Sequence, residues 1–487
     1  MSRQGMLRLC FIALFCSLSY PAYALKLTDF LEFQQHIQSS PAKNMLVTQV
    51  DVASAVCADS LPDWPLALID VVEQALCNNP KTSEVWATAR AQAEQVGVQR
   101  ADYLPKVNLI SGISKIHNEV TNSSFSFLDQ NNRILNRAHS LRLTWLVADF
   151  GQRSAKMSQA EALLDAANAL HDAALQEVFI SAAQAYFDHL SSQAMLGAFE
   201  ESEKVAKESL AAATAKFKAG VGLLTDQLQA QTAYAQAKLE RTKAEGDVNN
   251  AHGTLATAMG VVVNTRFSVK NRGDQLEKTD FVTTVDQMIQ EAIESHPSII
   301  AAKAKLRASK ENIQAVRAEG LPTLSFNAEI SRTDQLGQSQ LAGVPASDVY
   351  TDNSSVGLQV NVPLFEGFAR KHQVQSAEAE SQVRAAELKR VTQQVTLDVW
   401  KSYHALISER ESLRAAEELV DNSREAFAVA QGRYNAGVGN IVELLNAQNA
   451  WSSAKQQYIK SLSTWRTARL KLAASMGHVG LWAIAEP

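Results

Sequence analysis

The chain has 487 residues, of which 46% are hydrophobic, 20% charged and 7% aromatic, and its formal net charge is -5. It lacks the basic surplus that binding to a phosphate backbone requires, so nucleic acid is excluded as an expected partner. Beyond residue 24, no run approaches the roughly 18 to 20 consecutive apolar residues of a membrane-spanning helix. Any association with a membrane must therefore come from another kind of element.

Residues 1–24 are predicted to be a secretory signal peptide. Two arginines precede an apolar run that ends at Leu18, and Ala22-Tyr23-Ala24 supplies the small residues of a cleavage site. Cleavage after Ala24 would remove Cys10 and Cys16. An exported chain meets an oxidising compartment, so the remaining cysteines, Cys57 and Cys77, are predicted to form a disulfide. Two unpaired small hydrophobic residues are the alternative.

An internal duplication with one constant offset follows. Pairs of matching motifs are separated by 217 residues, among them Pro80 and Pro297, Ala219-Gly220-Val221-Gly222 and Ala436-Gly437-Val438-Gly439, and Met259-Gly260 and Met476-Gly477. The two copies are predicted at 66–260 and 283–477, with a polar linker at 261–282 and a tail at 478–487. Because loops normally drift in length, a constant offset indicates that the architecture fixes the element lengths.

Each copy predicts the same elements in the same order. A helix is expected at 66–102 and is ended by Pro105. Two alternating strands then form a hairpin, 106–148 in the first copy and 323–365 in the second. A proline-free helix of about 68 residues, on the order of 100 Å long, follows at 152–219, and no compact globule houses that length. A Gly-x-Gly turn and a shorter helix complete the copy.

The strands separate apolar from polar side chains. Leu141, Leu143, Trp145 and Val147 alternate with Arg142 and Thr144, and the second copy places Gln359 and Asn361 on its polar face. Four strands are too few to close a membrane barrel, which begins at about eight strands. If the strands span a membrane, the chain must therefore oligomerise. A small soluble sheet that caps a coiled coil is the alternative.

At this point the sequence resembles the TolC-like outer-membrane factors, the exit ducts of tripartite efflux pumps and type I secretion systems. The resemblance covers about 66–477 and rests on the repeated order of elements. It also rests on the Leu-Pro pair before each first strand, on Pro363-Leu364-Phe365-Glu366-Gly367, and on the paired tips Phe217-Lys218-Ala219-Gly220 and Tyr434-Asn435-Ala436-Gly437. The first copy departs from the pattern at its strand exit, which lacks the proline.

The resemblance implies an α+β fold of mainly long α-helices in the cell outer membrane. Three chains would each give four strands to one transmembrane β-barrel of 12 strands, continued by a periplasmic α-helical barrel. Residues 25–65 would be an N-terminal periplasmic extension, and the linker at 261–282 would lie in the equatorial region. The implied partners are two further copies, a periplasmic adaptor (membrane fusion protein), an inner-membrane ABC or proton-driven transporter, and outer-membrane lipid.

The helical tips hold the candidate gate and selectivity residues. Asp226 and Glu443 occupy matched positions, since 226 plus 217 is 443, and three chains would bring six carboxylates near the axis. By resemblance, Glu443 belongs to an acidic ring, with Asn446 where a second acid is common, while Thr225, Asp226 and Tyr434 form a link that holds the tips shut. Alternatively, Glu443 completes a capping box that begins at Asn440, and Asp226 favours its helix dipole.

The tip glycines have a structural and a functional interpretation. Gly220, Gly222, Gly437 and Gly439 are expected to be turn residues that end the long helices. By resemblance, they also mark where the adaptor docks.

An enzyme is not expected. Asp149-Phe150-Gly151 spells the kinase metal tripeptide, but neither a glycine-rich phosphate loop nor a catalytic-loop motif accompanies it. The ten histidines show no metal-ligand spacing, so neither a metal nor a cofactor is predicted. The function predicted is a passive export duct. The competing function is that of a secreted coiled-coil structural protein or adhesin without channel activity.

Overall fold

The computed structural model describes residues 65–125, 129–270, 284–338 and 347–477. The signal peptide, Cys57, most of the linker and the C-terminal tail therefore lie outside the described residues. The chain divides into two units, Met1–Ala55 and Val56–Pro487, and every described residue belongs to the second unit. The fold below is that of the second unit.

The described helices repeat with the offset found in the sequence. The first copy contains α3 (Leu68–Asn78), α4 (Pro80–Ala101), α5 (Gln152–Lys218) and α6 (Leu224–Ala258). Their counterparts are α7 (Val285–Ser295), α8 (Pro297–Ala318), α9 (Ala369–Asn435) and α10 (Ile441–Ser475). Each helix of the second copy begins and ends 217 residues after its counterpart, so the duplication extends to every helix boundary.

The single helix predicted at 66–102 is wrong. The structure has two helices, α3 and α4, separated at Asn79, which has an extended backbone and is followed by Pro80. A proline ring disfavours the helical conformation of the residue before it, so the first helix ends there. The Asn79 side chain then accepts a hydrogen bond of 2.9 Å from the Lys81 backbone N–H and caps α4. The second copy breaks in the same way at His296, before Pro297.

The strands form one antiparallel sheet in the order β1-β2-β3-β4. Its members are β1 (Lys106–Val120), β2 (Gln130–Ala148), β3 (Thr323–Gln338) and β4 (Ser347–Asn361). The strand β4 ends before residue 365, the end predicted for the second hairpin, because Pro363 has no backbone N–H to donate to a ladder. Within the described part of the chain, β1 and β4 each pair on one side only.

The two faces of the sheet differ as the alternation predicts. Leu143 lies opposite Val107 on one side and Ala328 on the other, and Ala328 lies opposite Val356, so these four share an apolar face. On the other face, the Arg142 guanidinium donates to the Glu329 carboxylate at 3.1 Å. The sheet therefore has one face suited to lipid and one suited to water.

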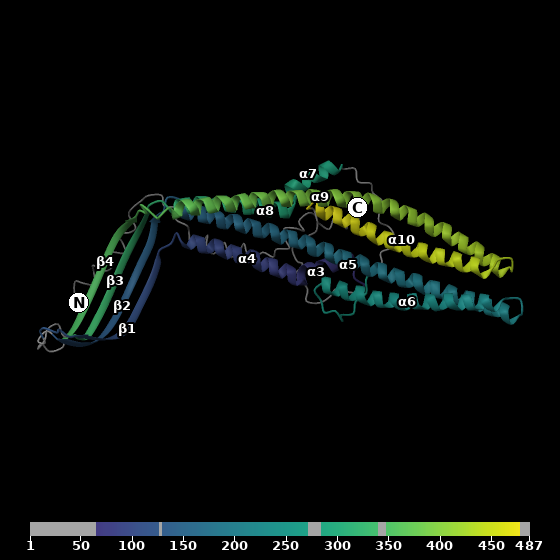
Figure 1. The fold of residues 1–487 in the computed structure, drawn as a ribbon, viewed down its shortest axis with the longest axis horizontal. Helices are drawn as coiled ribbons and strands as arrows, with labels where there is room; N and C mark the ends of the chain where they lie inside the picture. The colour runs from purple at the N-terminus through teal and green to yellow at the C-terminus, as the bar shows by residue number, and fades with distance from the viewer. Residues whose placement is uncertain (1–64, 126–128, 271–283, 339–346, 478–487) are drawn as a thin grey trace. The chain divides into compact units, whose positions relative to one another are not determined.

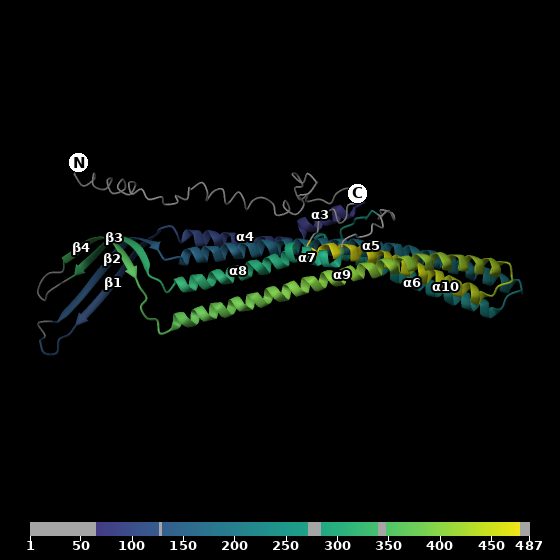
Figure 2. The same ribbon diagram turned by 90° about the horizontal axis from the view of Figure 1, so that it is seen from above.

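The helices pack side by side around α5. This helix contacts α4, α6, α8 and α10, and α9 contacts α8 and α10. Within the second unit the strands lie together at one end of the helices, and the α5–α6 and α9–α10 turns lie at the other (Figure 1 and Figure 2). Most buried residues of α5 are alanines, whose small side chains allow helices to approach closely. Among the described residues, no helix has the length and apolar character needed to cross a bilayer.

Each strand-to-helix junction is fixed by an arginine. In the first copy, the Arg153 Nε donates to Asp149 at 2.9 Å, and Arg153 also donates to the Leu146 carbonyl at 2.7 Å. Arg370, which is 217 residues further on, donates to Glu366 at 3.2 Å in the same way. Both junctions thereby tie the end of a strand to the first turn of a long helix.

Candidate gate at the helical tips

The glycines that end the long helices have left-handed backbones. Gly220 has a φ of +76° and Gly437 a φ of +79°. The following N–H groups of Val221 and Val438 donate to the carbonyls of Lys216 and Arg433, which closes the helix ends. Both turns therefore have the same conformation, and a residue with a side chain would be strained at either glycine.

The second glycine of each turn is required by close packing. A Cβ at Gly222 would lie 3.0 Å from the backbone nitrogen of Phe217, and one at Gly439 would lie 3.0 Å from the backbone nitrogen of Tyr434. Neither glycine has a positive φ. The prediction that all four are turn residues is confirmed, with conformation as the reason for two and space for the other two.

A lysine of the first copy binds a tyrosine of the second. The Lys216 ammonium donates a hydrogen bond to the Tyr434 carbonyl and lies 3.7 Å from the centroid of its ring, a cation–π contact. Tyr434 is only 3% exposed and packs in an apolar cluster with residues of all four tip helices, namely Ala213, Ala230, Phe427, Ile441 and Leu444. The two tips are therefore joined within one chain.

Asp226 lies close enough to Tyr434 to act on its charge. Burial raises the pKa of the Tyr434 hydroxyl, and the neighbouring negative charge of Asp226 raises it further. The structure thus brings together two of the three residues predicted to form the link. Thr225 is exposed beside Asp226, and Asn446 is exposed one turn beyond Glu443.

Glu443 is held by an arginine rather than by a complete capping box. Its backbone N–H donates to the Asn440 side chain at 2.7 Å, as predicted for a cap. The reciprocal half of the box is wrong, because the Glu443 carboxylate accepts from the Arg433 Nε at 3.1 Å. An ion pair with a cation across the turn is preferred over a neutral backbone donor.

Sequence reasoning missed the two basic residues of the tips. Lys216 and Arg433 are themselves equivalent, since 216 plus 217 is 433. A basic residue in the last turn of each long helix was the signal that could have identified them. Their contacts differ, because Arg433 binds within its own hairpin and Lys216 binds across to the other.

Cys77 lies in α3, and it is disulfide-bonded. Cys57, its predicted partner, lies outside the described residues, so the Cys57–Cys77 pairing stays a prediction. In the ranges that the structure describes, no group of three or more His, Cys, Asp or Glu side chains is placed to hold a metal ion.

Comparison with known proteins decides the family. The sequence profile of the outer membrane efflux protein family matches residues 71–261 and 288–478, which are the two copies of the duplication. The chain belongs to the outer membrane efflux protein family. The resemblance to the TolC-like outer-membrane factors is thereby confirmed, and so is the location in the outer membrane with the helices in the periplasm.

Two relatives and one solved structure illustrate the similarity. The chain is 31% identical over 423 residues to Protein CyaE of Bordetella pertussis, covering 87% of this chain and 86% of that one. It is 24% identical over 416 residues to the Proteases secretion protein PrtF of Dickeya chrysanthemi, covering 85% and 88%. The fold is similar to that of the Campylobacter jejuni CmeC outer membrane channel, with a TM-score of 0.72, 16% identity and coverage of 84% and 85%.

These matches agree on the class of protein. The family is one of efflux and secretion channels in the outer membrane, and the relatives are named as channel or secretion proteins rather than enzymes. The mostly helical fold with one four-stranded antiparallel sheet is that of its members.

Proposed function

We propose that three copies of the chain form the outer-membrane exit duct of a tripartite export system. The observation that carries the proposal is the sheet, which has one apolar face and pairs on one side only at each of its outer strands, β1 and β4. An unpaired strand edge is costly in hydrocarbon. If β1 of one chain pairs with β4 of the next, three sheets close into a single barrel and every edge is satisfied.

The duct is opened and closed at the helical tips. The Lys216–Tyr434 contact holds the two tip hairpins of a chain together, and Asp226 lies beside it. Separating the hairpins requires this contact to break and the apolar cluster around Tyr434 to open. In this proposal, Thr225, Asp226 and Tyr434 hold the closed state, while Asp226, Glu443 and Asn446 line the entrance.

The partners dock at the tips and supply the energy. Val221, Leu223 and Val438 are 79%, 67% and 70% exposed beside the turn glycines, so each turn presents apolar surface to a periplasmic adaptor. An inner-membrane ABC or proton-driven transporter then drives export through a duct that has no enzymatic activity and needs no cofactor. Type I protein secretion and multidrug efflux both fit this arrangement, and the name of the relative PrtF, a protease secretion protein, favours secretion.

Two adjacent substitutions in β4 test the barrel. Leu358 lies on the apolar face opposite Phe326, and Gln359 lies on the polar face opposite Ser325. Leu358→Arg should abolish trimers that resist detergent, because an arginine facing lipid costs ~2–4 kcal/mol near the midplane of the membrane. Gln359→Arg adds the same charge to the wet face and should leave trimers intact while changing their conductance in planar bilayers. A wild-type product that is soluble and non-conducting would contradict the duct and favour a secreted coiled-coil scaffold.

A further inference from the structure

The apolar face of the sheet changes character along the strands. Nearest the helices, its cross-strand rows contain Trp145 with Phe326 and Leu358, and then Leu143 with Ala328 and Val356. The row that begins with Ser111 is the first polar one, and it continues through His139, Arg332 and Asp352. Ser111 and His139 are in hydrogen-bond contact at 2.9 Å, so their side chains share this face. Beyond that row the face carries charged groups.

Three cations stand together in this distal part. Arg133 and Arg137 lie on β2 two residues either side of Leu135, and Lys115 lies opposite Leu135 on β1. Lys115 is therefore the diagonal neighbour of both arginines, a spacing of roughly 7–8 Å between Cα atoms. All three residues are exposed. We call Lys115, Arg133 and Arg137 the distal cationic cluster.

The acids near the cluster are engaged elsewhere or lie at its margin. Asp334 is directly opposite Arg137, but its carboxylate accepts from the Arg332 Nε at 3.0 Å. Glu119 lies toward the strand end, 4.0 Å from the His117 Nε2. Among the residues that the structure describes, no ion pair joins the cluster to a carboxylate. Its positive charge is thus available to a ligand outside the chain.

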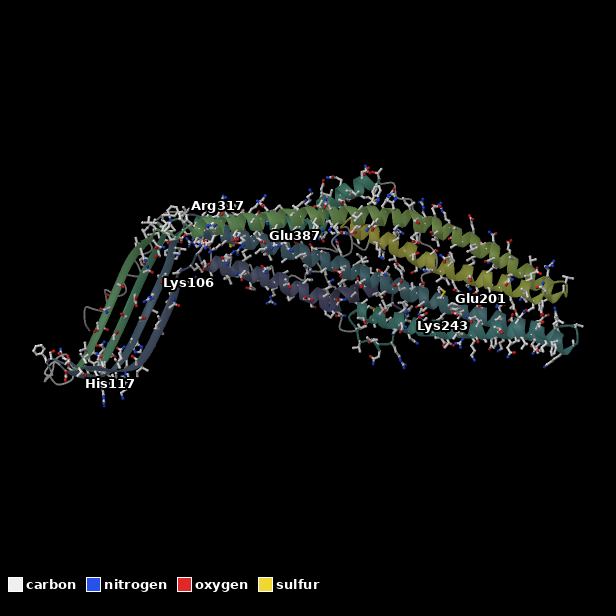
Figure 3. The ribbon with its side chains drawn as sticks, viewed as in Figure 1. Lys106, His117, Glu201, Lys243, Arg317 and Glu387 are labelled. Carbon is white, nitrogen blue, oxygen red and sulfur yellow. The ribbon has the colours of Figure 1, made fainter. Side chains whose placement is uncertain are left out.

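The cluster lies at the end of the sheet farthest from the helices. Figure 3 labels Lys106 beside the helices and His117 at the opposite end of the same strand, and His117 pairs with Arg133 of the cluster. Because the helices are periplasmic, this end faces the outer leaflet and the cell exterior. Long basic side chains at the edge of an apolar band place their charges at the level of lipid headgroups.

We propose that the distal cationic cluster binds the phosphate groups of phosphorylated glycolipid in the outer leaflet. Charge complementarity and continuity with the apolar face identify the occupant as lipid. Guanidinium groups bind phosphate through two parallel hydrogen bonds, and the lysine adds a third cation from the neighbouring strand. The orientation of the cluster toward lipid rests on the proposed function, in which the apolar face forms the outside of a barrel.

The test uses full-length protein purified in a neutral detergent. Native mass spectrometry would measure the binding of bisphosphorylated lipid A, of enzymatically dephosphorylated lipid A and of inorganic phosphate. The variant K115Q/R133Q/R137Q removes the cluster, and R142Q removes a cation of the same strand from the polar face. We expect wild-type protein and R142Q to retain bisphosphorylated lipid A. The triple variant should lose affinity for it by about tenfold or more.

Two outcomes would overturn the proposal. One is equal binding of lipid A by the triple variant and the wild type, and the other is equal binding of the phosphorylated and dephosphorylated lipids. Tight binding of free inorganic phosphate would assign the cluster to a soluble anion instead of lipid, and would also overturn it. Trimer formation and membrane fractionation are measured on the same samples. Stable, conducting trimers without a preference for phosphorylated lipid contradict this inference alone, whereas a wild type that forms no membrane-bound trimer contradicts the proposed function.

Discussion

The two tips have the same backbone and different side-chain contacts. Both turns use one glycine with a positive φ and a second glycine in close contact with the preceding helix. In the second copy, Arg433 pairs with Glu443 inside its own hairpin. In the first copy, the equivalent Lys216 crosses to Tyr434, and no salt bridge to Asp226 forms among the described residues. Duplication therefore preserved the turn and let one copy hold the other.

The same division applies along the whole repeat. Positions where the backbone is tightly constrained have the same residue in both copies, such as Gly260 and Gly477. Positions where only a side chain decides the contact have diverged, such as His189, whose counterpart is Leu406. Substitutions at both kinds of position can test whether the copies are equivalent in structure but not in function.

The largest loss of stability is expected at Gly260. Its φ is +74°, and a Cβ there would lie 2.4 Å from the Asn78 carbonyl oxygen. Gly260→Ala should lower the free energy of unfolding by about 3 kcal/mol or more, because it adds both strain and a backbone clash. Gly477→Ala should cost less, since its Cβ would meet the His296 Cα at 2.8 Å. Thermal melting of the trimer measures both.

Gly246→Ala is the matched control for these variants. Gly246 lies within α6, and a Cβ there would meet nothing within 4 Å. The alanine should stabilise the helix by about 1 kcal/mol. If Gly260→Ala melted at the same temperature as the wild type, the close approach of the α6 end to Asn78 would be contradicted.

The next largest effect is an acid sensitivity confined to the first copy. Burial lowers the pKa of His189 to about 4, and the neighbouring His252 lowers it further. The folded state therefore favours the neutral ring, so stability is full above the ordinary pKa of 6.5 and is lost as the pH falls through about 4. The loss should reach about 3 kcal/mol. His189→Leu, which introduces the residue of the second copy, should remove it, as melting curves between pH 7 and pH 4 would show.

His372→Leu is the control for the acid experiment. His372 is exposed on α9, so its replacement should leave the acid dependence of the wild type in place. An unchanged acid dependence in His189→Leu would show that other groups cause the loss.

A smaller effect on stability, with a clear effect on gating, is expected from Lys216→Met. The methionine keeps the length of the side chain and removes the ammonium, which forfeits the hydrogen bond and the cation–π contact with Tyr434, about 1–2 kcal/mol together. Single-channel recordings should show more frequent opening. Arg433→Met breaks only the pair within one hairpin, so it should open less often than Lys216→Met, and the reverse ranking would count against a link between the copies.

The smallest effect is expected for the acids of the entrance. Asp226 has no arginine comparable to the one that pairs with Glu443, so its charge is offset less. Asp226→Asn should therefore weaken block by cations more than Glu443→Gln does, measured as the voltage-dependent block of single channels. Equal effects of the two variants would mean that Arg433 does not neutralise Glu443. No effect of either would leave only their roles at the helix starts.

The sequence predicted the order of elements well and the contacts poorly. The long helices begin and end within a residue or so of the predicted limits, because a proline-free helical pattern followed by glycine has few alternatives. The break at Asn79 was missed although Pro80 signalled it. The Lys216–Tyr434 contact was beyond reach, because a constant offset reveals which residues are equivalent and says nothing of which residues meet. Only the fold brings the two hairpins together.

The equal lengths of the helices have a consequence for how such a chain can change. Both α5 and α9 have 67 residues, and both α6 and α10 have 35. One residue inserted into α5 alone would move its tip by ~1.5 Å along the axis and turn it by about 100° relative to the neighbouring tip. Lys216 would then no longer face Tyr434. Insertions and deletions in these helices therefore survive only when both halves of the gene acquire them, so the length of the helices is inherited as one shared trait.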